Sequence, residues 1–103
     1  MDSEAATTRL EIKGEMNIFT AAVCRQQLLD ALEQPGDVEV DLSAVSEIDS
    51  AGVQLMIAAK REAAARSRTL RFAGHSRAVF DALELFDIGG HLGDPLLIHS
   101  GTE

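Results

Sequence analysis

The stretch "VDLSAVSEIDSAGVQLMIAAKREAAAR", Val40–Arg66, holds a short polar junction between two apolar runs. Upstream of the junction, residues 37–42 alternate acidic and apolar side chains, the period-two pattern of a half-buried strand. Downstream, the alanine-rich run from Ser50 to about Ala65 has high helix propensity. The junction therefore predicts a strand that leads directly into a helix, with Asp49 or Ser50 as the helix cap.

The chain before this junction predicts one more strand and one more helix. In "TRLEIKGEMNIF", residues 8–19, the apolar positions alternate around Gly14, which indicates a bent strand or a short hairpin with Ile18 as its last apolar position. Thr20 is a candidate cap for a helix over residues 21–33, whose apolar stripe includes Cys24 as core filler. The turn "QPGD" ends that helix, because proline cannot continue it.

The chain after the junction predicts three further short elements. They are a strand at "TLRFAG" (69–74), a helix at "SRAVFDALELF" (76–86) capped by Ser76, and a last strand at "DPLLIHS" (94–100). Strands that alternate with helices over such short intervals are typical of an α/β domain with a largely parallel sheet. Functional groups in such sheets gather where strands end and helices begin, which points to residues 43–52.

Length, charge and cysteine content limit the possible functions. A chain of 103 residues predicts one domain, residues 7–103, behind a disordered segment of residues 1–6. Its net charge of −8 opposes binding to nucleic acid or to an anionic membrane. Because the amino terminus lacks a secretory pattern and no apolar run approaches the roughly 20 residues of a membrane span, we expect a cytoplasmic protein.

Residues that could support catalysis are scarce. His75, His91 and His99 lack the spacing of metal ligands and are expected at the surface or in loops. The glycines do not form a phosphate-binding loop of a familiar spacing, which disfavours a nucleotide-binding enzyme. A phosphate-receiving response regulator would use acids such as Asp41 and Asp49, but it also needs a lysine near its last strand, and this chain has none there. We therefore expect no catalytic residue, no metal and no cofactor.

The junction itself allows two interpretations. Helix capping explains why Ser, Asp and Gly occur there, and the residues alone favour it. A hydroxyl at a helix start, in a loop that also contains Glu47, is equally suited to regulated phosphorylation of Ser50. The two roles are compatible.

Three blocks of the sequence resemble the STAS domains of bacterial anti-sigma factor antagonists. Residues 40–66 resemble the central block, in which a strand ending in "DLS" leads through "ID-S/T-x-G" into a helix. "GEMNIFTAAVCRQQL", Gly14–Leu28, is similar to the family's "GELD" element and first helix, and residues 70–93 resemble its fourth strand and third helix. The resemblance implies a single STAS-like α/β domain, with a mostly parallel sheet of four to five strands, an antiparallel edge strand, and helices packed mainly on one face.

The resemblance also implies a signalling function without enzymatic activity. In this family the unphosphorylated protein binds a serine kinase that is also an anti-sigma factor, phosphorylation ends the interaction, and a phosphatase restores it. The phosphorylated hydroxyl corresponds to Ser50, so the resemblance implies a phosphoprotein of bacterial transcription regulation. The expected partner-binding surface consists of Glu47, Asp49, Ser50, Ala51, Gly52 and Gln54.

The sequence departs from the family pattern at two positions, and it also resembles STAS proteins that work in two other kinds of system. Ala51 stands where many phosphorylated members have a second hydroxyl, and Asn17 stands where "GELD" has its acid. "GEMNIFTAA" and "HLGDPLLI" resemble small STAS proteins of chemosensory pathways. A STAS subunit of a lipid-trafficking ABC transporter shares the same central block, and in either setting the domain would act by binding alone.

Overall fold

The computed structural model of the chain describes residues 7–86. The elements, in order, are β1 (Thr7–Met16), α1 (Ala21–Leu32), β2 (Asp37–Ile48), α2 (Ser50–Ala65), β3 (Leu70–Ala73) and α3 (Arg77–Phe86). The predicted disordered segment 1–6, the predicted last strand 94–100, His91 and His99 lie outside the described residues.

The described strands form one parallel sheet of three strands in the order β1-β2-β3. Residues 7–86 therefore contain three parallel strands, whereas four to five strands with an antiparallel edge strand were expected. Residues 8–19 contain no hairpin, because β1 continues through Gly14 (φ +80°) and pairs with β2 from Thr7 opposite Asp37 to Met16 opposite Ile48. The helix α1 is the crossover that parallel pairing of consecutive strands requires.

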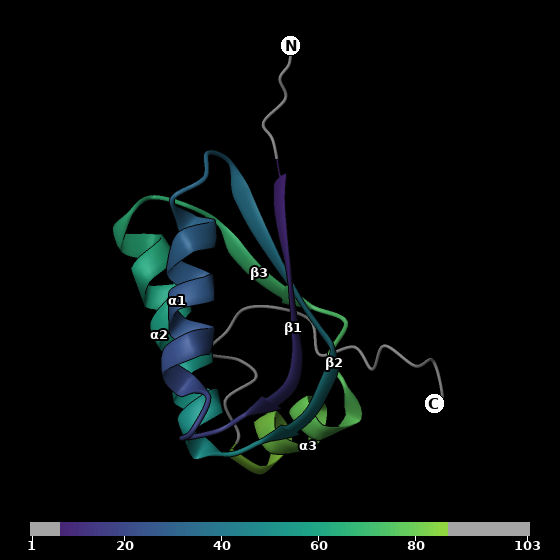
Figure 1. The fold of residues 1–103 in the computed structure, drawn as a ribbon. Coiled ribbons are helices and arrows are strands. Elements are labelled where there is room, and N and C mark those ends of the chain that lie inside the picture. Colours follow the sequence, from purple (N-terminus) through teal and green to yellow (C-terminus); the bar gives the residue numbers. More distant parts are fainter. Residues whose placement is uncertain (1–6, 87–103) are drawn as a thin grey trace.

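Bulges bend the β1–β2 pair towards its carboxyl end. Between Glu11 and Lys13, and again between Gly14 and Glu15, β2 contains one residue more than β1. An extra residue on one strand increases the local twist and bends the ladder. Both strands accordingly curve at their carboxyl ends, near α3 (Figure 1).

The helices α1 and α2 lie side by side over the sheet, whereas α3 packs against β2 near the curved end (Figure 1). The apolar side chains of β2 face the core in alternation, and Cys24 is buried among them as predicted. The fully buried large apolar side chains come from every helix and from β1 and β2: Ile12, Met16, Leu28, Leu32, Val38, Val40, Leu42, Val45, Met56, Val79 and Leu83.

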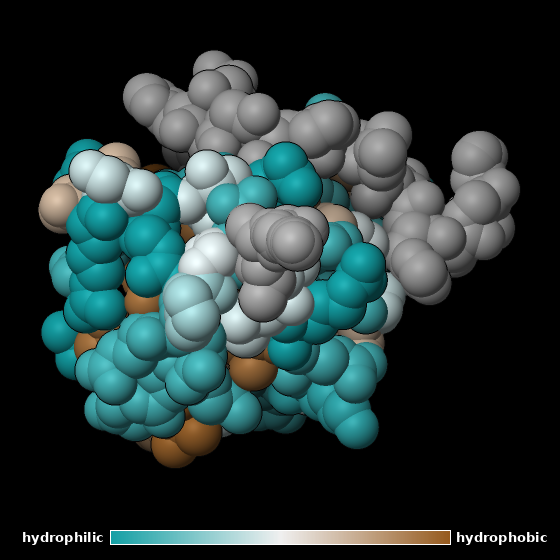
Figure 2. All heavy atoms as spheres, turned by 90° about the horizontal axis from the view of Figure 1, so that it is seen from above, coloured by the Kyte–Doolittle hydropathy of each residue, from teal (hydrophilic) through white to brown (hydrophobic). Residues whose placement is uncertain are grey.

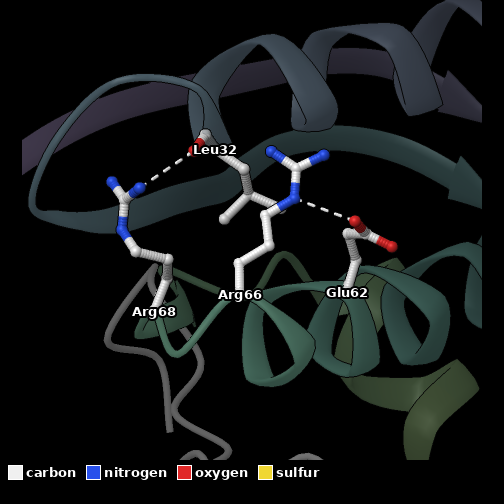
Figure 3. Close-up of polar contacts among 4 residues, drawn as sticks. All are labelled: Leu32, Glu62, Arg66 and Arg68. Atoms are coloured by element: carbon white, nitrogen blue, oxygen red, sulfur yellow. Dashed lines mark hydrogen bonds and ion pairs between the residues drawn. The ribbon is translucent and has the colours of Figure 1, made fainter.

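Arg68 joins the end of α1 to the connection between α2 and β3. Its guanidinium donates to the carbonyl oxygen of Leu32 at 3.2 Å, as Figure 3 shows, and to that of Gly36 at 3.1 and 2.7 Å. It also donates to the carbonyl oxygen of Gln34. One side chain thus satisfies carbonyl groups that the end of a helix and the following turn leave open.

His75 lies in the connection between β3 and α3, as expected of a loop histidine, but it is fully buried, so the alternative of a surface position was wrong for this residue. The chain turns at Gly74 (φ +63°), where an added Cβ would lie 2.6 Å from Oδ1 of Asp41. This close turn immediately precedes the buried His75. A lone histidine in a polar segment carries no sequence signal for such a position.

Candidate functional site

The candidate site lies where the carboxyl ends of β1 and β2 meet the amino end of α2. Ile48 is the last residue of β2 and Ser50 is the first residue of α2, so a single residue, Asp49, connects strand and helix. The predicted strand-to-helix junction and the predicted start of α2 at Ser50 are both confirmed.

Asp49, and not Ser50, caps α2. Its Oδ1 accepts hydrogen bonds from the backbone N–H groups of Ala51 at 2.9 Å and Gly52 at 3.2 Å. Its Oδ2 accepts from the N–H of Ile18 at 3.3 Å, across 31 positions of sequence. One carboxylate therefore fixes the start of α2 and the turn after β1 together, and the Ser50 side chain is not needed for capping.

Gly52 allows the start of α2 to lie directly against β1. An added Cβ would be 2.5 Å from the carbonyl oxygen of Met16 and 2.7 Å from Cγ1 of Ile48, closer than real Cβ atoms come. The same Met16 oxygen accepts from the N–H of Asp49 at 3.1 Å. Gly52 is buried, so its contribution to the expected partner-binding surface is to position the exposed residues around it.

The exposed polar residues of the site occur on both sides of the junction. Ser50 is exposed at the first position of α2, and Gln54 is exposed four residues later, on the same face of the helix. Glu47 is exposed near the end of β2, opposite Glu15 in the β1–β2 register. The structure thus brings Glu47, Asp49, Ser50 and Gln54 to one end of the molecule, while Ala51 is half-buried.

The turn between β1 and α1 is closed by side chains rather than by a helix cap. Oδ1 of Asn17 accepts from the N–H groups of Phe19 at 2.9 Å and Thr20 at 3.1 Å. The Thr20 hydroxyl accepts from the Asn17 N–H at 2.9 Å and donates to the Glu15 carbonyl oxygen at 2.8 Å. Thr20 occupies the N-cap position of α1 but makes no capping hydrogen bond, so its predicted capping role was wrong.

This turn presents two exposed apolar side chains that the sequence analysis did not assign to the site. Ile18 is 69% exposed and Phe19 is 89% exposed. The strand pattern placed Ile18 inside β1, but β1 ends at Met16, and the Asn17 hydrogen bonds turn the chain outward. The opposite end of the described molecule is mostly hydrophilic (Figure 2), so this apolar pair distinguishes the end that holds Ser50.

Residues 7–86 contain neither a metal site nor a membrane span. Among them, no group of three or more His, Cys, Asp and Glu side chains is arranged to hold a metal ion. None of the described helices is long and apolar enough to cross a membrane. The candidate site presents the exposed hydroxyl of Ser50 next to the exposed acids Glu47 and Asp49.

Comparison with known sequences identifies the family. A family model described as "Mlab, STAS domain" matches residues 1–98. The chain is also similar to the anti-sigma-B factor antagonist of Bacillus subtilis (strain 168), with 28% identity over 82 residues, which cover 80% of this chain and 72% of that protein. Proteins of the STAS family are generally non-catalytic regulatory domains.

Solved structures share the architecture. A sulfate transporter family protein from Wolinella succinogenes has a TM-score of 0.69 at 25% identity, over 84% of this chain and 71% of that one. A putative anti-sigma factor antagonist from Thermotoga maritima has a TM-score of 0.73 at 18% identity, over 85% and 77% of the two chains. The anti-sigma factor antagonist SpoIIAA in its unphosphorylated form has a TM-score of 0.65 at 21% identity, over 86% and 79%. The last two show the fold alone. The family match over residues 1–98 establishes that the chain belongs to the STAS domain family.

Proposed function

We propose that this protein is a regulatory switch of the anti-sigma factor antagonist type. It binds a partner serine kinase that is also an anti-sigma factor, and phosphorylation of Ser50 turns the interaction off. The observation that supports this most is the position of Ser50, which is exposed at the first residue of α2 while Asp49 supplies the helix cap. The hydroxyl is therefore available to a kinase without loss of a capping contact.

The surroundings of Ser50 suit a substrate of a kinase better than an enzyme. Gly52 packs against β1, and Asp49 joins α2 to the turn at Ile18, so the hydroxyl is presented from a firmly held backbone. The partner supplies ATP, metal ion and catalysis, and this domain supplies the acceptor oxygen. A phosphatase then returns the protein to its binding state.

Phosphorylation acts on binding through charge. A phosphate adds about −1.5 to −2 charge at neutral pH. The N–H groups of Ala51 and Gly52, which could otherwise hold a phosphate at a helix start, already donate to Asp49. The new charge therefore projects from the surface.

The cost of this charge to binding can be estimated from Coulomb's law. An acidic group of the partner about 6 Å away, at an effective dielectric constant near 20, makes each added unit of charge cost roughly 3 kcal/mol, about a hundredfold in affinity.

The relatives support a partner protein as the ligand. The Bacillus subtilis relative is by name an antagonist of an anti-sigma factor, a function exerted through protein binding. SpoIIAA is described in an unphosphorylated form, which makes phosphorylation a relevant state for a protein of this fold. Exposed Ile18 and Phe19, beside Ser50, provide apolar area for such a partner.

Intact-mass spectrometry after incubation with ATP and a serine kinase isolated as a binding partner of the protein tests the site assignment. Wild type is expected to gain one phosphate and Ser50→Ala none. Ser46→Ala is the matched control, because Ser46 is also exposed and lies four residues earlier, in β2, so this variant should still gain one phosphate. A phosphate that persists in Ser50→Ala contradicts the assignment.

A second candidate function is docking without phosphorylation. The exposed apolar pair, Ile18 and Phe19, suits a binding surface whether or not Ser50 is modified. The domain would then be a docking subunit in a chemosensory pathway or in a lipid-trafficking ABC transporter. Kinase that binds the protein but adds no phosphate to any variant would favour this function.

A further inference from the structure

The strand β1 has an edge that no other described strand covers. Within residues 7–86 it pairs with β2 alone, along one side of its ten residues. The backbone groups on the other side point away from the sheet and can pair with a further strand. The exposed side chains of β1 indicate which strand could pair with this edge.

The exposed side chains of β1 alternate in charge. Arg9, Glu11, Lys13 and Glu15 are all exposed, at every second position. They share one face of the strand, opposite the face of buried Ile12, and the alternation continues through Gly14 because the extra bulge residues belong to β2. The four charges sum to zero on a protein of net charge −8, so the edge is a place where a second copy meets no net repulsion.

We propose that β1 pairs with β1 of a second copy of this chain, antiparallel, about a two-fold axis at Ile12. In this register Arg9 of each copy lies opposite Glu15 of the other, and Glu11 of each lies opposite Lys13 of the other. Residues directly opposite in an antiparallel pair have their side chains on the same face and in contact. The interface therefore contains four ion pairs and joins two three-stranded sheets into one of six.

The charge order selects this register over its neighbours. Charged side chains on an edge strand usually prevent pairing. Here, an antiparallel axis at Glu11 would place Arg9 against Lys13, an axis at Lys13 would place Glu11 against Glu15, and parallel pairing in register would oppose like charges throughout. An axis at Leu10 would join Arg9 to Glu11 but would place uncharged Thr7 opposite Lys13.

A groove beside the same edge supplies apolar surface for the second copy. It has a volume of about 670 Å³ and is bounded by residues 11–15 of β1 and by the turn and first half of α1, including Phe19 and Val23. Phe19 is 89% exposed and Val23 is 64% exposed. A two-fold axis perpendicular to the sheet keeps the helices of both copies on the same side, so each groove opens towards the other copy and Val23 loses contact with water there.

Sedimentation equilibrium over a range of protein concentration tests this interface. Wild type is expected to form a dimer. Glu11→Lys places lysine opposite lysine, and Lys13→Glu places glutamate opposite glutamate, once on each side of the two-fold axis. Each single change turns two attractive pairs into repulsive ones and is expected to weaken dimerisation about tenfold, with an unchanged far-UV circular dichroism spectrum.

Charge exchange identifies the register. The double variant Glu11→Lys/Lys13→Glu restores opposite charges in the register about Ile12 and is expected to recover wild-type dimerisation. An equimolar mixture of the two single variants is expected to form the heterodimer. Dimerisation that neither single change weakens, a double variant that is not rescued, or a wild type that stays monomeric at every concentration would each overturn the proposal. None of these outcomes depends on whether Ser50 is phosphorylated.

Discussion

Asp49 is the residue on which the geometry of the site depends most. Its carboxylate accepts the N–H groups of Ala51 and Gly52 in α2 and the N–H of Ile18 in the turn after β1. It therefore performs the capping role that Ser50 was also a candidate for, and it leaves the Ser50 hydroxyl exposed. The structural role falls to Asp49, and the regulatory role that we propose falls to the adjacent Ser50.

Replacement of Asp49 tests this division. Asp49→Ala removes the cap and is expected to lower the free energy of unfolding by about 1–2 kcal/mol, measured by urea denaturation. Asp49→Asn is expected to cost less, because its amide oxygen can still accept from the start of α2. Glu47→Ala is the control at an exposed neighbouring acid, and a loss in Glu47→Ala as large as in Asp49→Ala would contradict the assignment.

At the scale of elements, the connections are stabilised by single side chains from distant positions. Arg68 follows α2 and donates to carbonyl oxygens at the end of α1 and in the turn before β2. Arg66, two residues earlier, instead pairs with Glu62 at 2.8 Å on the surface of α2, as Figure 3 shows. The two arginines thus differ in whether they join separate elements.

The pair of arginines allows a matched test of this difference. Arg68→Met leaves several carbonyl groups without their charged donor and is expected to lower the free energy of unfolding by about 1.5–3 kcal/mol. Arg66→Met removes an exposed ion pair within one helix, worth about 0.3–0.5 kcal/mol. Thermal unfolding of both variants measures the difference, and equal midpoints would contradict the role given to Arg68.

The sequence predicts the elements better than it predicts how they meet. The bounds of α2 follow from a local cap and an alanine-rich run, and the buried position of Cys24 follows from helical spacing. The contacts of Asp49 with Ile18 and of Arg68 with Leu32 span 31 and 36 positions, and no local pattern encodes them. The turn that exposes Ile18 was missed for the same reason, since the alternation of β1 gives no sign of where pairing with β2 stops.

At the scale of the whole molecule, the two ends of the sheet differ in surface chemistry. One end holds Ser50 among acids beside exposed Ile18 and Phe19, and the other is mostly hydrophilic (Figure 2). A charge added at Ser50 therefore falls within the surface that we propose for the partner. Because Asp49 and Gly52 already fix the start of α2, the switch that we propose requires a change of charge and no rearrangement of the fold.

The affinity of the partner kinase for the two forms of the protein tests this central claim most directly. Titration calorimetry with the kinase and ADP should be carried out on the unphosphorylated protein and on protein phosphorylated only at Ser50. We predict that phosphorylation weakens binding about a thousandfold or more, since it adds about 1.5 to 2 units of charge at roughly 3 kcal/mol each. It should leave the thermal midpoint of the free protein within about 2 °C, since a local surface charge changes stability by less than about 0.5 kcal/mol. Equal affinities of the two forms would contradict the account.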